Sequence, residues 1–315
     1  IIKRVSNSYQ QGIVMKYILI CVLLIISSTI NAKPNKSFNC PVNDWPTSKI
    51  NTFKANKFID NTLNIDEFAI EMVDCLADAN PNIRDGVAYM AFSNWLRNNN
   101  LSENAVLALY NTLNDDIKHK TNDDKQVYLP FVILAYSEVV RVDRIEPYLT
   151  EQQLAQSVNL IADLIKGIND HRGFEDGIGW RHLVAHSADV TLQLILNKRL
   201  TAKQHDVLLD ALFSQVSPNQ HSYTFGESKR IATPVLYSWL GNHATIEQWQ
   251  QRLNALINPA PFASWQDVYA SEAGLHELHN TRAFLLELYK TVSSNDMERL
   301  NLLEPSIQQA LNQLR

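Results

Sequence analysis

The sequence predicts an all-α protein of stacked antiparallel helical hairpins, either a HEAT-like α-solenoid or an irregular helical bundle. Apolar residues recur at three- and four-residue intervals along most of the chain, which is typical of amphipathic helices. Long segments with strand-type alternation are absent. Helix-start signals at Ser102, Thr150, Thr201 and Thr245 fall 48, 51 and 44 residues apart, close to the period of two-helix repeats. Residue identities do not repeat at that period, so both arrangements remain open.

The N-terminal segment has the pattern of a secretory signal over residues 15–32. Met15 and Lys16 precede an apolar run, Tyr17 to Ile26, and small and polar residues follow up to Ala32. The run is shorter than the roughly 20 residues that cross a bilayer, so a membrane anchor is the weaker alternative. Residues 1–14 are interpreted as an artefact of the assigned start. We therefore expect a periplasmic or secreted protein without a stable membrane anchor after signal cleavage.

Two cysteines, Cys40 and Cys75, remain after removal of the signal. In an oxidising compartment an isolated pair favours a disulfide over a metal site, because two thiols lack the usual additional zinc ligands. Two unpaired cysteines are the alternative. The bond would connect an N-terminal arm, residues 33–60, to a single all-helical domain over residues 61–315.

Helix starts along this domain are marked by side chains that accept hydrogen bonds from free backbone N–H groups. They are Asn64, Asn80 before Pro81, Ser102, and the Thr-x-x-Gln capping boxes Thr150/Gln153, Thr201/Gln204 and Thr245/Gln248. A strand is arguable only over Val127 to Tyr136, where Pro130 makes a regular central strand improbable.

The charge balance argues against nucleic-acid binding. Of the 28 Lys and Arg residues, three lie in residues 1–32, so the rest of the chain has 25 basic and 33 acidic residues, a net charge of −8. Non-specific nucleic-acid binding needs a cationic surface. The expected partner is instead a peptide, a protein or an envelope component.

Residues 171–193 are the most distinctive segment. Gly173, Gly177 and Gly179 lie close together, which indicates a loop, and a helix is expected after them. At 100° per residue, His182, His186, Asp189 and Gln193 share one face of that helix between apolar flanks. This polar stripe is therefore expected to be partly buried or to line a groove.

Two interpretations of the polar stripe remain open. His182, His186 and Asp189 could hold a divalent metal such as zinc, the one cofactor that the sequence suggests. The stripe could instead form a buried hydrogen-bond network between helices, which we favour. Additional ligand-binding candidates are Gly173, Asp176 and Trp180 in and after the loop, and Glu227 and Arg230 downstream. Glu227 could equally be a favourable charge in the first turn of a helix.

The chain resembles the bacterial family known as domain of unknown function 2785 over about residues 60–290. The residues that carry this resemblance are Asn82-Ile83-Arg84-Asp85-Gly86-Val87-Ala88-Tyr89, Trp95-Leu96, Arg172-Gly173-Phe174, Gly179-Trp180-Arg181-His182-Leu183-Val184-Ala185-His186-Ser187-Ala188-Asp189, Glu227, Arg230, His279-Asn280, Phe284-Leu285 and Leu288-Tyr289. The resemblance implies an all-helical repeat protein and no established activity.

The chain departs from the family pattern at Leu129-Pro130-Phe131-Val132, where an Arg-Ser-Phe-Ser stretch is expected. If that arginine normally reaches the polar stripe, either the site is altered here or another basic residue, such as Arg230, replaces it.

Two functions follow as hypotheses. The first is an exported helical-repeat protein that binds a peptide or envelope ligand in a groove containing the polar stripe. The alternative is a metal-dependent hydrolase that uses His182, His186 and Asp189. Whether the protein is an enzyme is not determined by the sequence.

Overall fold

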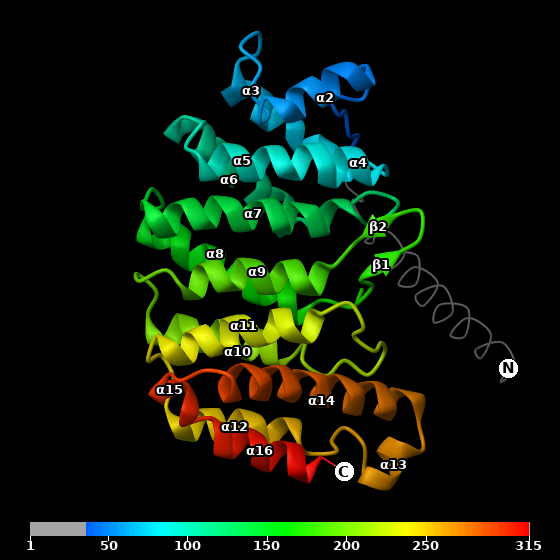
Figure 1. Cartoon of the computed structure of the whole chain (residues 1–315), viewed down its shortest axis with the longest axis vertical. Helices are drawn as coiled ribbons and strands as arrows, with labels where there is room; N and C mark the ends of the chain where they lie inside the picture. The colour runs from blue at the N-terminus through cyan, green and yellow to red at the C-terminus, as the bar shows by residue number, and fades with distance from the viewer. Residues whose placement is uncertain (1–35, 315) are drawn as a thin grey trace, which may run out of the picture. The chain divides into compact units, whose positions relative to one another are not determined.

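The helices stack in two layers within residues 36–314, the part that this computed structural model describes (Figure 1). The predicted signal and the segment before Met15 lie outside it. One layer contains α5 (Met90–Arg97), α7 (Tyr128–Ile145), α9 (Leu183–Ile195), α11 (Glu227–Leu240) and α14 (Glu272–Ser293). The other contains α6 (Glu103–Lys118), α8 (Glu151–Lys166) and α10 (Ala202–Phe213). The all-α prediction is confirmed.

Neighbouring helices of the first layer run parallel. Pro130 near the start of α7 contacts His186 near the start of α9. Arg144 near the end of α7 contacts Gln193 near the end of α9. This direction places the N-terminal ends of α7, α9 and α11 at one end of the layer, where the short hairpin of β1 (Phe174–Glu175) and β2 (Gly179–Trp180) also lies.

Shorter helices precede and follow these layers. Before α5 the chain forms α2 (Thr47–Ala55), α3 (Ile65–Glu71), the 3₁₀ segment η1 (Met72–Ala77), α4 (Pro81–Ile83) and the π-helical segment η2 (Arg84–Tyr89). Around α14 it forms α12 (Ile246–Leu256), α13 (Trp265–Tyr269), α15 (Glu298–Asn301) and α16 (Glu304–Gln313). None of the helices described is both long and apolar enough to cross a bilayer.

The N-terminal arm packs against the first helices. Phe53 of α2 contacts Phe68 of α3 and Trp95 of α5 through edge-to-face ring contacts. The Cys40–Cys75 disulfide, which was predicted, joins the arm to η1. Residues 37–314 therefore fold as one compact unit that includes most of the arm.

Local start signals operate as the sequence predicts. All three Thr-x-x-Gln capping boxes form, with each Thr side chain accepting from the third helical N–H and each Gln accepting from the Thr N–H. Asn80 also caps a helix whose first residue is Pro81. The segment around Pro130, for which a strand was arguable, belongs to α7. Pro130 lies in the first turn, where backbone N–H groups have no intrahelical acceptor, so the lack of an N–H on proline costs no helical hydrogen bond.

Candidate functional site

Most of the residues that the sequence singled out belong to the segment of β1 and β2 and to the first two turns of α9 and α11, which lie at one end of the layer (Figure 1). Gly177 and Gly179 adopt positive φ angles of 81° and 83°, which allow the chain to turn between β1 and β2. The chain then enters α9 through His182, which has a left-handed conformation with φ of 56°. Such a conformation is uncommon for a residue with a side chain and is enriched at functional sites.

His182 and Glu227 form a buried pair between α9 and α11. The His182 Nε2 atom lies 3.2 Å from Glu227 Oε1, and Glu227 is only 2% exposed. Burial raises the pKa of Glu227, but the adjacent His182 and hydrogen bonds from backbone N–H groups outweigh it, so the pKa lies below its ordinary value. Glu227 is thus both the first residue of α11 and a partner of the polar stripe.

His186 connects α9 to α7. Its Nδ1 atom lies 2.9 Å from the carbonyl oxygen of Pro130, an acceptor only, so Nδ1 carries the proton. The residue is 6% exposed, and desolvation lowers its pKa to about 3. A neutral His186 therefore has an unprotonated Nε2 atom, and its ring centroid lies 6.0 Å from that of His182.

Asp189 is paired with an arginine instead of the histidines. Both of its carboxylate oxygens accept from Arg230 of α11, a two-point contact that fixes the side chain. At the end of the stripe, Gln193 accepts from Arg144 of α7 at 3.1 Å. Every residue of the stripe consequently contacts a neighbouring helix.

The predicted metal site is not assembled. Within residues 36–314, no three His, Cys, Asp or Glu side chains lie close enough together to hold a metal ion. His182 and His186 are neighbours, but Asp189 pairs with Arg230, so the three side chains do not converge in this geometry. The physical reason is that a shared helix face does not determine which neighbouring side chain each group pairs with.

Three aromatic side chains cover the His182–Glu227 pair, and we call Phe174, Trp180 and Phe225 the aromatic surface. Trp180 lies 5.0 Å from Phe174 and 5.9 Å from Phe225 between ring centroids, with both pairs edge to face. The ring of His182 lies 4.3 Å from that of Trp180. The three aromatic residues are 41%, 39% and 41% exposed, respectively.

Sequence reasoning found Trp180 but missed both phenylalanines. Each stands in a polar loop beside a residue that was singled out, Phe174 after Gly173 and Phe225 before Gly226-Glu227. An aromatic residue in a polar glycine-containing loop was the available signal. Asp176, also predicted, is exposed at the turn and makes no side-chain hydrogen bond or ion pair in the described part of the chain.

A second polar cluster lies on the same layer and was also missed. Glu138 of α7 is buried, accepts from Tyr89 of η2 at 3.2 Å, and pairs with Arg97 of α5. Burial, and then the nearby charge of Glu138, raises the pKa of Tyr89 to about 12, so Tyr89 stays a neutral donor. Because these residues come from three helices, no local sequence pattern signals the cluster.

A glycine is required at position 173 because the side chains of Phe225 and Glu227 approach it closely. A Cβ atom at this position would lie 2.3 Å from Phe225 Cδ2 and 2.8 Å from Glu227 Oε1. Gly173→Ala is therefore expected to displace Phe225 and to lower the free energy of unfolding by about 1–3 kcal/mol, measured by urea denaturation. Gly86→Ala is the matched control, since its nearest neighbour is the flexible end of Lys54. Equal stability of both variants would contradict this account of Gly173.

Comparison with known proteins identifies the family without an activity. No curated protein and no solved structure matches the chain. One family profile, described as a protein of unknown function, matches residues 91–289, which include α7, α9, α11 and the aromatic surface. The match covers more than half of the 315 residues. The chain therefore belongs to the DUF2785 family.

Proposed function

We propose that this protein is an exported binding protein that recognises an envelope component at the aromatic surface. The observation that carries the proposal is the exposure of Phe174, Trp180 and Phe225, which contact one another over the buried His182–Glu227 pair. Burying large aromatic side chains in an interface is strongly favourable, and a contiguous exposed group of them marks an interaction site.

The scaffold beneath the aromatic surface supports binding in a fixed geometry. Gly173 allows Phe225 and Glu227 to approach the hairpin, and the register of β1 and β2 places Phe174 beside Trp180. A surface that is ordered before the ligand arrives loses less conformational entropy on binding. Asp189, which the hydrolase alternative needs as a ligand, is occupied by Arg230, so no observation favours that alternative.

The charges around the aromatic surface favour a neutral ligand. Four basic groups nearby have carboxylate partners. These pairs are Arg172–Asp170, Arg181–Glu175, His182–Glu227 and Arg230–Asp189. Paired groups offer donors and acceptors with little net charge. A saccharide presents hydroxyl groups at its edge and C–H groups on its face, and the latter pack on aromatic rings. We therefore propose a neutral envelope glycan as the ligand, with a peptide as the competing class.

Export is supported by two observations. The Cys40–Cys75 disulfide is typical of proteins that fold in an oxidising compartment. The predicted signal over residues 15–32 ends a few residues before this disulfide. Together they favour a location in the periplasm or outside the cell, where envelope glycans are accessible.

The proposal is tested by titrating the protein with an N-acetylglucosamine oligomer and, separately, with a short neutral peptide. We expect the glycan to change the tryptophan fluorescence, and Trp180→Ala to weaken binding by about tenfold or more, as for other central aromatic contacts. Tyr237→Ala is the matched control, because Tyr237 is a similarly exposed aromatic residue in the second half of α11.

The outcomes separate the site from the ligand class. Peptide binding that is lost in Trp180→Ala would keep the site and replace the glycan by a peptide. Binding of either probe that is unchanged in Trp180→Ala, or the absence of binding by both probes, would overturn the proposal.

A further inference from the structure

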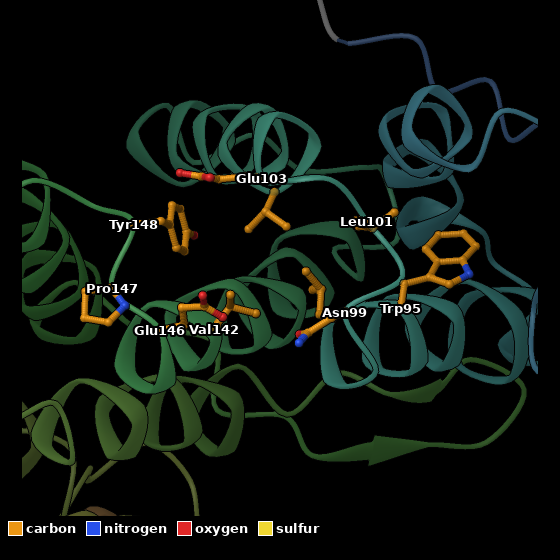
Figure 2. Close-up of a pocket in the computed structure, with 10 residues that line it drawn as sticks. Trp95, Asn99, Leu101, Glu103, Val142, Glu146, Pro147 and Tyr148 are labelled. Atoms are coloured by element: carbon orange, nitrogen blue, oxygen red, sulfur yellow. The ribbon is translucent and has the colours of Figure 1, made fainter.

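A separate pocket lies at the other end of the first layer, where α5 and α7 end and α6 begins (Figure 2). Its volume is about 300 Å³, within the range of small-molecule sites. Apolar and aromatic side chains form most of its wall, namely Trp95, Leu96, Leu101, Val106, Val142, Pro147 and Tyr148. The pocket is thus large enough and apolar enough to enclose the hydrocarbon part of a small organic molecule.

The polar atoms of its two aromatic residues are already used. Tyr148 donates its hydroxyl hydrogen to the carbonyl oxygen of Val139 at 3.1 Å. Trp95 donates its indole N–H to the carbonyl oxygen of Phe58 at 2.8 Å. These bonds fix both rings. Tyr148 is partly exposed and offers ring surface to a ligand, whereas Trp95 is fully buried.

The charged groups of the pocket are both acidic. Glu103, the first residue of α6, and Glu146, the residue after α7, line it, while no Lys or Arg side chain does. Neither carboxylate takes part in an ion pair or side-chain hydrogen bond with the residues that the structure describes. In Figure 2 the two glutamates stand on opposite sides of Tyr148. A ligand cation would therefore meet two unpaired carboxylates.

We propose that this pocket binds a small organic ammonium ion. Its hydrocarbon body would pack against the apolar wall, and its charged nitrogen would lie near Glu103 and Glu146. Attraction to carboxylates favours a cation, and the electron-rich ring of Tyr148 adds to that preference. The site is distinct from the aromatic surface and does not depend on the function proposed above.

The test compares three ligands of one shape, 2-phenylethylammonium, 2-phenylethanol and 3-phenylpropanoate, by calorimetry or NMR at low salt. We expect the ammonium ion to bind most tightly and the carboxylate most weakly. Glu103→Gln combined with Glu146→Gln should weaken ammonium binding by about threefold to tenfold, the sum of two solvent-exposed charge interactions, and leave the affinity for the alcohol unchanged. Higher salt should weaken ammonium binding in the same direction.

Two controls keep this test decisive. Glu71→Gln removes an exposed glutamate outside the pocket and should leave all three affinities unchanged. Val106→Phe narrows the pocket and should reduce binding of the ammonium ion and the alcohol alike. Equal affinity for the three ligands, failure of the ammonium ion to bind at millimolar concentration, or unchanged ammonium binding in the double Gln variant would each overturn the proposal.

Discussion

Replacing Cys40 and Cys75 together by serine is expected to lower the free energy of unfolding by about 4 kcal/mol. The disulfide closes a loop between residues 35 positions apart, and the chain-entropy relation gives this magnitude for the freedom that the unfolded chain regains. We expect the N-terminal arm to lose the most stability. The disulfide holds the arm at Cys40, and α2, which follows Cys40 in the arm, contacts α3 through Phe53 and Phe68.

The measurement is urea denaturation of the wild-type and double-serine proteins, with a reducing agent added to the wild-type protein as a second route to the same change. Both routes should give similar midpoints. A loss well below 1 kcal/mol would show that packing of Phe53 against Phe68 and Trp95 holds the arm without the disulfide.

Acidification is expected to destabilise the protein through His186. Burial holds its folded-state pKa at about 3, against an ordinary value of 6.5. At a pH below the ordinary pKa, His186 is protonated in the unfolded chain but stays neutral in the folded protein. The contribution of His186 to the free energy of unfolding is therefore constant above the ordinary pKa and falls as the pH decreases below it. Between about pH 7 and about pH 4 the loss from His186 is about 3 kcal/mol.

The pH dependence is measured as the free energy of unfolding in wild type, His186→Asn and His119→Asn proteins. An asparagine amide can donate to the Pro130 carbonyl but does not titrate, so His186→Asn should lose less stability on acidification. His119 is exposed, and His119→Asn is the control for removing an imidazole from the surface. His205, whose pKa burial lowers to about 4, contributes in the same direction in all three proteins. Parallel slopes in wild type and His186→Asn would contradict the role of His186.

The helix starts were predictable because they depend on neighbouring residues. A Thr-x-x-Gln box satisfies two free N–H groups within one turn, and Thr150, Thr201 and Thr245 each do so regardless of the surrounding structure. The Cys40–Cys75 pairing was predictable for a different reason, since only two cysteines remained after the signal.

The composition of the site was only partly predictable. The spacing of His182, His186 and Asp189 predicts one stripe, but their distances to each other and to other elements depend on how α7, α9 and α11 pack. Asp189 pairs with a residue 41 positions away, and Phe225 meets Trp180 from another loop. Periodicity contains no information about such partners.

The sequence by itself determined where helices begin, which face of α9 is polar, which cysteines pair and which family the chain resembles. The tertiary structure decided that Asp189 pairs with Arg230 instead of the histidines and that the three rings of the aromatic surface contact one another. It also decided that Glu103 and Glu146 line one pocket. The physical reason is the sequence separation of the interacting residues. Capping and amphipathicity depend on residues a few positions apart, whereas these arrangements arise only when helices distant in sequence pack side by side.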